Sequence, residues 1–453
     1  MKKLKRFKII IAFLCFIAVI ITCFGTTLVN ATGSFPDVSG VDKVYLYNFE
    51  SGKVVYSKGS QTASIAPAST VKIMSGLLAI EQLNGRLDEN ITVTSDMLYN
   101  VEGFTVNLKE GDILTVKDLL YCLICGGGND AAIILAIVCS GSIESFVEQM
   151  NRTASSYGMS NTKYSNPTGI DTDGMTTTIN DTVILSQKAI ENELFVEISS
   201  TRSYTYKLGG SSETRTVVNR NPLISNFSAS GYQNKNVKGL NAGMTDNGGY
   251  CVSAYASNGK DSYLCIIMGG TLTMNGRITS YSVANSLLSH VFKNYTYTKI
   301  AEKGSIIGAL TVDLALPVNG SQAVTVNCVL ENDVYGYAPC NIDYKRDLTY
   351  KTYYHSDPLT APVNKNTIVG GVDIYYQNEY IATARLITDS DVVESDLLIA
   401  LDKMKSITLS RPVFIFLVLA ILLILLYLYL TVWKSKLRKR RAIENEKNNK
   451  KIR

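Results

Sequence analysis

Two residues within the stretch 67–78 could together carry out nucleophilic chemistry. Ser69 and Lys72 are three positions apart, so in a helix both side chains lie on one face. A serine hydroxyl becomes a strong nucleophile only when a base takes its proton, and a lysine can be that base once its pKa is lowered. The alternative is a helix-capping serine with an exposed lysine. Because Lys72 lies within an apolar run, where an unpaired charge is costly, we favour a nucleophile and its general base.

Local signals predict where the helix that carries this pair begins. Pro67 ends any helix before it, and a mainly apolar run then extends from Val71 to Leu83. We therefore expect the helix to begin near Ser69. Its N-terminus supplies partial positive charge and free N–H groups at the place where an oxyanion would form.

Other catalytic chemistries have little support in the sequence. The chain has only two histidines, His290 and His355, and both are distant in sequence from Ser69. This disfavours a Ser-His-Asp triad and makes a lysine base the simpler choice. No cluster of metal-ligating residues is visible, so we expect neither a metal nor a cofactor.

The N-terminal segment, residues 1–31, is predicted to be a signal peptide. Basic residues precede an apolar core over residues 9–24, and Val29-Asn30-Ala31 allows cleavage before Thr32. The alternative is an uncleaved anchor.

A transmembrane helix is predicted over residues 411–433 of the 453-residue chain. Residues 413–433 carry no charge and are long enough to cross about 30 Å of hydrocarbon. Residues 434–453 are strongly basic, which places this tail in the cytoplasm and the body of the protein outside the cell membrane. The body is net acidic, which argues against a nucleic-acid partner.

Seven cysteines remain once Cys15 and Cys23 leave with the signal peptide. An odd number in an exported protein leaves at least one free thiol, and the sequence leaves any pairing open. Cys122 and Cys125 form a C-x-x-C pair, but the helix-forming run around them favours packing in a core over a redox centre.

The order of the predicted elements indicates an α+β fold for residues 38–295. A strand pair comes first, several helices follow, and three strands and a helix over residues 278–292 close the segment. The predicted strands are residues 44–47, 53–56, 237–243, 250–256 and 263–268. Because strands lie at both ends of the segment, we expect one sheet that pairs them and is flanked by helices.

A small β-rich domain is predicted over residues 298–390. Helical periodicity stops near Tyr297, and short segments of alternating apolar and polar residues take its place. Residues 391–410 are predicted to be a linker, with some helical character, that leads to the membrane helix.

The motif Pro-Ala-Ser-Thr-Val-Lys-Ile-Met at residues 67–74 resembles the active-site helix of the serine D-alanyl-D-alanine carboxypeptidases, the low-molecular-mass penicillin-binding proteins. Further motifs follow in that family's order and approximate spacing, at residues 128–132, 166–169, 219–223 and 239–246. Several weak motifs in one order make a specific signal. The resemblance covers the whole exported body and implies a β-lactamase/transpeptidase-like domain, a β-rich module and a C-terminal membrane segment.

The resemblance implies a role for particular residues. Ser69 would be the acylated nucleophile, Lys72 its base, and Asn129 the asparagine of the family's Ser-x-Asn motif, which holds the substrate's peptide. The backbone N–H groups of Ser69 and Met244 would form the oxyanion hole. The strand that binds substrate would contribute Asn241, Ala242 and Gly243. Peptidoglycan stem peptides would be the substrates, and β-lactams would be covalent inhibitors.

Two motifs depart from the family's pattern. Gly127 stands where the family has the serine of Ser-x-Asn, and that serine would carry a proton in a step worth about 10²–10⁴-fold. Asn241 and Ala242 stand where it has a lysine and a threonine, which would hold the substrate's terminal carboxylate; losing such a buried cation costs about 2–5 kcal/mol. Arg220 could replace the cation, whereas Lys238 would face the other side of the strand.

Three functions are compatible with this pattern. The first is a membrane-anchored serine peptidase that trims D-alanine from stem peptides with weakened or altered specificity. The second is a non-catalytic relative that binds peptidoglycan or a partner in wall synthesis. A β-lactamase is less favoured, because no deacylating glutamate stands out and the chain carries a β-rich module and an anchor. Retention of Ser69 and Lys72 favours the peptidase.

Overall fold

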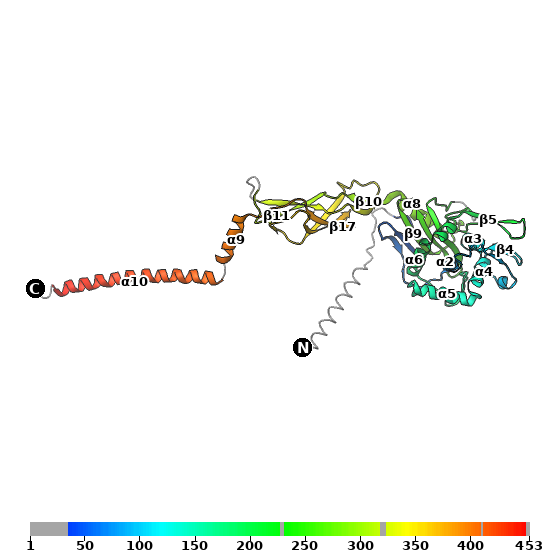
Figure 1. Cartoon of the computed structure of the whole chain (residues 1–453), viewed down its shortest axis with the longest axis horizontal. Coiled ribbons are helices and arrows are strands. Elements are labelled where there is room, and N and C mark those ends of the chain that lie inside the picture. Colours follow the sequence, from blue (N-terminus) through cyan, green and yellow to red (C-terminus); the bar gives the residue numbers. More distant parts are fainter. Residues whose placement is uncertain (1–34, 227–230, 318–322, 409–410, 450–453) are drawn as a thin grey trace, which may run out of the picture. The chain divides into compact units, whose positions relative to one another are not determined.

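The computed structural model describes residues 35–226, 231–317, 323–408 and 411–449, and Figure 1 shows their helices and strands. The predicted signal peptide, residues 1–31, lies outside the described residues. By its internal contacts the chain forms two compact units. The first comprises the chain up to Ala301 together with Val334–Thr349 and Ile374–Ala382, and the second comprises Glu302–Asp333, Tyr350–Asp373 and Thr383–Arg453. The domain boundaries predicted from the sequence stay predictions.

A five-stranded antiparallel sheet organises the first unit, with its strands in the order β2-β1-β9-β8-β7. The strands are β1 (Lys43–Asn48), β2 (Lys53–Lys58), β7 (Val237–Thr245), β8 (Gly249–Ser257) and β9 (Ser262–Gly270). In the pairing of β1 with β9, Lys43 lies opposite Met268. The prediction of an α+β fold whose sheet joins both ends of the segment is therefore confirmed.

The sheet of the first unit is buried on both faces. Side chains of β9 alternate between two cores: Leu264 and Ile266 enter one, and Tyr263 and Cys265 enter the other. This is the two-residue period of a strand that is covered on both sides. Helix α8 (Thr279–Asn294) packs in the core that contains Tyr263. The other core takes in α2 (Val71–Gln82), α3 (Val116–Ile124), α4 (Asn129–Ser140), α5 (Ile143–Ser156), α6 (Ile179–Ile190) and α7 (Glu193–Ser200).

Helix α2 lies at the centre of its core, with every residue from Val71 to Ile80 buried. Gly76 lets its neighbours approach closely, because a Cβ atom there would come within 2.8 Å of Ile124 and 3.1 Å of Phe195. A single 3₁₀ turn, Ala68–Thr70, precedes the helix. Ser69 therefore lies in that turn, and Lys72 lies in the first turn of α2.

Several short elements of the first unit have no counterpart in the prediction. They are α7 and the hairpins β3 (Asn90–Thr92) with β4 (Ile113–Thr115) and β5 (Ser203–Lys207) with β6 (Thr214–Val218). A further pair is β10 (Tyr295–Ala301) with β13 (Val334–Pro339). A long loop, residues 99–112, lies within the connection from β3 to β4 and contacts the β5–β6 hairpin in the polar network described below.

The β-rich character of the C-terminal region is also confirmed. A six-stranded sheet has the order β14-β16-β17-β12-β11-β15. Its strands are β11 (Ile306–Asp313), β12 (Val324–Leu330), β14 (Leu348–Tyr354), β15 (Leu359–Thr360), β16 (Ile368–Tyr376) and β17 (Glu379–Thr388).

The chain continues into α9 (Asp396–Thr408) and the long helix α10 (Arg411–Asn449). Within α10, Phe414–Ile443 is long and apolar enough to cross a membrane. The bent pair of α4 and α5 meets the same criterion, but these helices belong to the buried core of the first unit. Among the described helices, α10 is therefore the one suited to a membrane.

Candidate functional site

A cleft of about 360 Å³ in the first unit brings together every site residue predicted from the sequence. Its walls come from the turn before α2, the start of α4, the edge strand β7, the first turn of α8 and three loops. The predicted residues that line it are Ser69, Lys72, Gly127, Asn129, Arg220, Asn241, Ala242, Gly243 and Met244. No histidine is among the described residues that line the cleft.

Ser69 lies in the cleft against the backbone of β7. A Cβ atom at Gly243 would come within 2.2 Å of the Ser69 Cβ and 2.3 Å of its Oγ. Only glycine therefore allows the strand to pass this close to the serine. The preceding residue, Ala68, has a φ of +47°, a left-handed conformation that costs a non-glycine residue about 1–3 kcal/mol and is enriched at functional sites.

Lys72 is buried beside Ser69, with only 4% of its surface exposed. Its Nζ donates a hydrogen bond of 2.6 Å to the backbone carbonyl of Thr168. Burial, followed by the positive charge of Arg220, lowers the pKa of the Lys72 ammonium from 10.5 to about 7. The lysine is therefore neutral in a large fraction of molecules near pH 7, as a general base must be.

The carbonyl that holds Lys72 is itself fixed by a tight turn at residues 166–169. The Asn166 Oδ1 accepts hydrogen bonds from the backbone N–H groups of Thr168, at 3.1 Å, and Gly169, at 2.7 Å. Ser75 of α2 donates to the carbonyl of Pro167 at 2.7 Å. The turn is thus tied to the helix that carries the lysine. The sequence identifies residues 166–169 as one of the motifs, but it does not predict that the carbonyl of Thr168 binds Lys72.

Asn129 occupies the first position of α4 and is 4% exposed. Its Nδ2 donates a hydrogen bond of 2.7 Å to the carbonyl of Glu102. Its Oδ1 has no hydrogen-bond partner among the described residues, although it is buried. An acceptor in this state is available to a donor that enters the cleft, such as a peptide N–H group.

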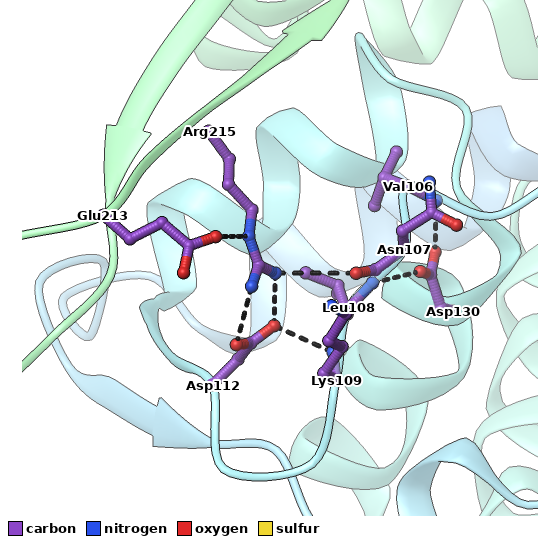
Figure 2. Close-up of polar contacts among 8 residues, drawn as sticks. All are labelled: Val106, Asn107, Leu108, Lys109, Asp112, Asp130, Glu213 and Arg215. Atoms are coloured by element: carbon purple, nitrogen blue, oxygen red, sulfur yellow. Dashed lines mark hydrogen bonds and ion pairs between the residues drawn. The ribbon is translucent and has the colours of Figure 1, made fainter. Parts of the chain in front are cut away.

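The loop that carries Gly103 and Phe104 into the cleft is held by charged residues, and Figure 2 shows their contacts with it. Asp130 accepts hydrogen bonds from the backbone N–H groups of Val106, at 3.1 Å, and Leu108, at 3.0 Å. On the other side of the loop, Arg215 of β6 forms a two-point ion pair with Asp112. Both partners of this ion pair are largely buried. The cleft wall is therefore fixed to α4 on one side and to the β5–β6 hairpin on the other.

Arg220 is the second cationic side chain in the lining of the cleft. Its guanidinium carbon lies 3.9 Å from the centre of the Phe104 ring, which is a cation–π contact. Its backbone N–H donates to the carbonyl of Cys125 at 3.0 Å. The aliphatic part of its side chain lies over Gly127, where a Cβ atom would be 3.2 Å from the Arg220 Cγ. Gly127 has a φ of +69°, a conformation that favours glycine.

Strand β7 forms the opposite wall of the cleft. Asn241 is 7% exposed, and its buried Oδ1 has no hydrogen-bond partner among the described residues. Ala242 is buried beside it and offers no polar group. Met244, next to Gly243, lines the cleft while its side chain is half-exposed. Lys238 is exposed and is absent from the described lining, as its place on the strand predicts.

The cysteine pair and the histidines considered in the sequence are not among the described residues that line the cleft. Cys122 and Cys125 are buried free thiols of the core, and burial raises the pKa of Cys125 to about 12. A thiol with such a pKa is unreactive near neutral pH. His290, on α8, packs against the rings of Phe35 and Tyr295. Among the described residues, no group of three or more histidines, cysteines and acidic side chains could hold a metal ion.

The arrangement suits acyl transfer. A hydroxyl, a buried amine with a lowered pKa and the N-terminal turns of a helix converge on one cleft. These groups can supply a nucleophile, a base and oxyanion donors.

Comparison with known proteins gives two family matches. Residues 33–271 match a family described as D-alanyl-D-alanine carboxypeptidase. Residues 295–394 match the penicillin-binding protein 5 C-terminal domain.

Characterised relatives cover most of the chain. The D-alanyl-D-alanine carboxypeptidase DacF of Bacillus subtilis is 25% identical over 362 residues, which are 78% of this chain and 86% of that protein. The carboxypeptidase DacD of Escherichia coli is 27% identical over 364 residues, which are 78% of this chain and 87% of that protein.

Solved structures share the fold. Penicillin-binding protein 5 from Haemophilus influenzae superposes with a TM-score of 0.54 at 23% identity, covering 80% of this chain and 100% of that one. The Streptomyces K15 DD-transpeptidase superposes with a TM-score of 0.51 at 26% identity, covering 57% of this chain and 99% of that one.

Proposed function

Because this chain belongs to the D-alanyl-D-alanine carboxypeptidase family, we propose that it removes terminal D-alanine from the stem peptides of the cell wall through an acyl-enzyme on Ser69. The observation that carries the proposal is Lys72, a buried amine with a pKa of about 7 one helical turn from the serine. A chain that had kept Ser69 only as a remnant would have no need to bury a lysine beside it.

The proposed reaction has two halves. Neutral Lys72 takes the proton of the Ser69 hydroxyl, and the oxygen attacks the carbonyl carbon of the penultimate D-alanine. The bond to the last residue breaks, and its nitrogen takes the proton from Lys72 and leaves as the amine of free D-alanine. Water then attacks the ester and gives a proton to the neutral Lys72, which passes it to the Ser69 oxygen as the shortened peptide departs as a carboxylic acid.

The surrounding groups support these steps. The hydrogen bond from Lys72 to the carbonyl of Thr168 fixes one N–H direction, so that the lone pair of the neutral amine can point to Ser69. The backbone N–H groups of Ser69 and Met244 are proposed as the oxyanion donors. Asn129 is proposed to receive a substrate N–H group on its unpaired Oδ1.

Arg220 is proposed to bind the terminal carboxylate of the substrate. In the family's third motif a lysine and a threonine would do this, but here Asn241 and Ala242 take their places. Arg220 brings positive charge to the same cleft, and the cation–π contact with Phe104 holds its guanidinium group there. The neutral Asn241 can add a hydrogen bond through its amide, but it supplies no charge.

A non-catalytic function remains the second candidate, and the motif departures favour it. Without the serine at position 127 and the lysine and threonine at 241 and 242, peptide can bind while the chemical step is slow. Such a protein would bind peptidoglycan or a partner in wall synthesis. β-Lactams are proposed as covalent inhibitors only if Ser69 reacts.

One experiment separates the two functions. The purified full-length protein in detergent is incubated with a penicillin, and the mass of the peptide that contains Ser69 is measured. Under the peptidase proposal this peptide gains the mass of the penicillin, Ser69→Ala abolishes the gain, and a D-Ala-D-Ala peptide releases D-alanine. Absence of both the adduct and released D-alanine would leave the binding function as the better account.

We further propose that α10 anchors the protein in the cell membrane, with the first unit outside and the basic tail in the cytoplasm. Protease added to intact cells should digest the body and spare the tail. A body that is protected from the protease would overturn this orientation.

A further inference from the structure

A second hollow of the first unit has lining residues that differ from those of the cleft. This groove of about 550 Å³ lies between α8, the segment that precedes β7 and the turn between β8 and β9. Eight of the nine described residues that line it carry amide, hydroxyl or ammonium groups, among them Asn234, Lys235, Asn258, Asn285, Ser289 and Lys293. None of the described residues that line it carries a carboxylate.

The amide groups of this polar groove are oriented by hydrogen bonds before any ligand arrives. The Nδ2 of Asn234 donates to the Oδ1 of Asn285 at 3.0 Å and to the Oγ of Ser289 at 3.3 Å. The Oδ1 of Asn234 accepts from the backbone N–H of Asn236 at 3.1 Å. The Oδ1 of Asn258 accepts from the backbone of its own turn. Side chains that are already ordered lose less entropy when they bind.

The chemistry of the polar groove defines a class of ligand. Amide groups both donate and accept hydrogen bonds, so they match a ligand rich in hydroxyl and acetamido groups. Lys235 and Lys293 are exposed and attract negative charge. Phe292, packed edge-on against Tyr263 and half-buried, adds an apolar surface at the end of the groove. The volume falls within the range of small-molecule sites, about 300–1,000 Å³.

Helix α8 connects the polar groove to the cleft. Tyr281 in its first turn lines the cleft, and Asn285, Ser289 and Phe292 line the groove. These four positions are three or four residues apart, so they fall on one stripe of the helix. From Tyr281 to Ser289 the rise along the axis is about 12 Å. The two hollows therefore lie near one another along α8, with the buried Tyr281 and the Tyr232 ring that packs on it between them.

The segment before β7, from Tyr232 to Asn236, also connects the cleft to the polar groove. The Tyr232 ring packs edge-on against Tyr281, and its hydroxyl accepts a hydrogen bond of 2.7 Å from the backbone N–H of Ile278. Arg277, which is exposed, lies over the same ring at 5.5 Å. The chain then runs directly into Asn234 of the polar groove. A third positive charge thus stands near the helix that joins the two hollows.

We propose that the polar groove binds a glycan of N-acetylated, carboxylated amino sugars, the polymer from which wall stem peptides branch. The hydroxyl and acetamido groups bind the amides, and the carboxylates face Lys235 and Lys293. Glycan held along α8 presents its peptide branches to the cleft. The choice of glycan rests on the proposed function, whereas the groove and its charge do not.

The test measures binding of a peptide-free tetrasaccharide of alternating N-acetylglucosamine and N-acetylmuramic acid to the full-length protein in detergent, by calorimetry. The N-acetylglucosamine tetramer, which has no carboxylate, is the second probe. The variants are Asn285→Leu with Ser289→Ala, and Lys293→Glu. The matched controls are Ser286→Ala, an exposed position of α8 outside the lining, and Lys207→Glu on the exposed side of β5.

We expect the double variant to weaken binding of both sugars at least fivefold, and Lys293→Glu to weaken only the carboxylated one. The controls should bind as wild type does. Equal binding by wild type and the double variant, or no binding by wild type at millimolar sugar, would overturn the proposal. All measurements are repeated on Ser69→Ala, so that failure of the reaction and failure of the groove are seen separately. Thermal unfolding verifies that each variant is folded.

Discussion

The side chain of Arg220 occupies the space that a side chain at Gly127 would have to enter. A Cβ atom at Gly127 would lie 3.2 Å from the Arg220 Cγ and 3.4 Å from its Cβ. The backbone at Gly127 also has a positive φ. The glycine and the arginine therefore fit as a pair, and placing a serine at this position alone has a structural cost.

The first prediction measures that cost. Gly127→Ser should lower the free energy of unfolding by more than the roughly 1–2 kcal/mol that a left-handed conformation costs a non-glycine residue, because Arg220 must also move. The matched control is Gly141→Ser, where φ is +81° but no atom lies within 4 Å of the new Cβ. Urea unfolding of both variants gives the comparison. Equal losses would show that the contact with Arg220 has no energetic consequence.

The second prediction concerns the close approach of β7 to the serine. In Gly243→Ala the new methyl group would lie 2.3 Å from the Ser69 Oγ, so the strand or the serine must shift. A shift of about 1 Å can cost about 10²-fold in rate. Labelling by penicillin should fall by at least that factor, while thermal unfolding reports a folded protein. Unchanged labelling would mean that β7 does not control the position of the nucleophile.

The third prediction concerns the pH dependence of acylation. With a Lys72 pKa of about 7, acylation should rise as pH increases through 7 and level off above it, since only the neutral amine accepts a proton. Arg220→Gln removes a positive charge that lowers this pKa, so the midpoint should move to higher pH. Lys238→Gln, at an exposed position outside the described lining, should leave it in place. A midpoint unaffected by Arg220→Gln would exclude this electrostatic link.

The fourth prediction concerns stability. The pKa of Lys72 is about 7 in the folded protein and 10.5 as its ordinary value. Between these two pH values the unfolded chain therefore binds more protons than the folded protein does. The buried charge lowers the free energy of unfolding by its full amount below pH 7, and this loss disappears as pH rises towards 10.5.

Lys72→Met should accordingly stabilise the fold by about 2–4 kcal/mol at pH 6.5 and by much less at pH 9.5. Lys207→Met, at an exposed site, is the control. Urea unfolding at the two pH values provides the measurement. A gain that is the same at both values would contradict burial as the cause of the lowered pKa.

The fifth prediction tests the proposal that Asn241 and Ala242 of β7 replace a lysine and a threonine. Asn241→Lys with Ala242→Thr adds a charge and a hydroxyl at the wall opposite Arg220, and we expect a lower KM for a D-Ala-D-Ala peptide, by about tenfold or more. The groups act on one substrate carboxylate, so the gain should shrink when Arg220→Gln is combined with the pair and be non-additive. D-alanine release is measured for each variant. If the pair binds peptide and still releases none, the cleft has lost its chemistry for other reasons.

The parts of the site that depend on residues close together in the sequence were predictable. The apolar run around Lys72 and the proline before Ser69 were enough to predict a buried lysine near a helix start. The carbonyl of Thr168 and the contact of Gly127 with Arg220 were not predictable, because each joins positions about 90 residues apart whose approach is set by packing. The hairpin of β5 and β6 was missed for a similar reason: its short, mostly exposed strands alternate only weakly.

The pairing of β1 with β9 has a consequence for the folding of the protein during its synthesis. β1 and Ser69 emerge from the ribosome early, whereas β9 and Gly243 of β7, which lies against Ser69, follow roughly two hundred residues later. Contacts so distant in sequence form slowly. During synthesis the serine and the lysine therefore exist for a time without their cleft, and under the proposed function the growing chain is inert to penicillin until β7 and β9 have been added.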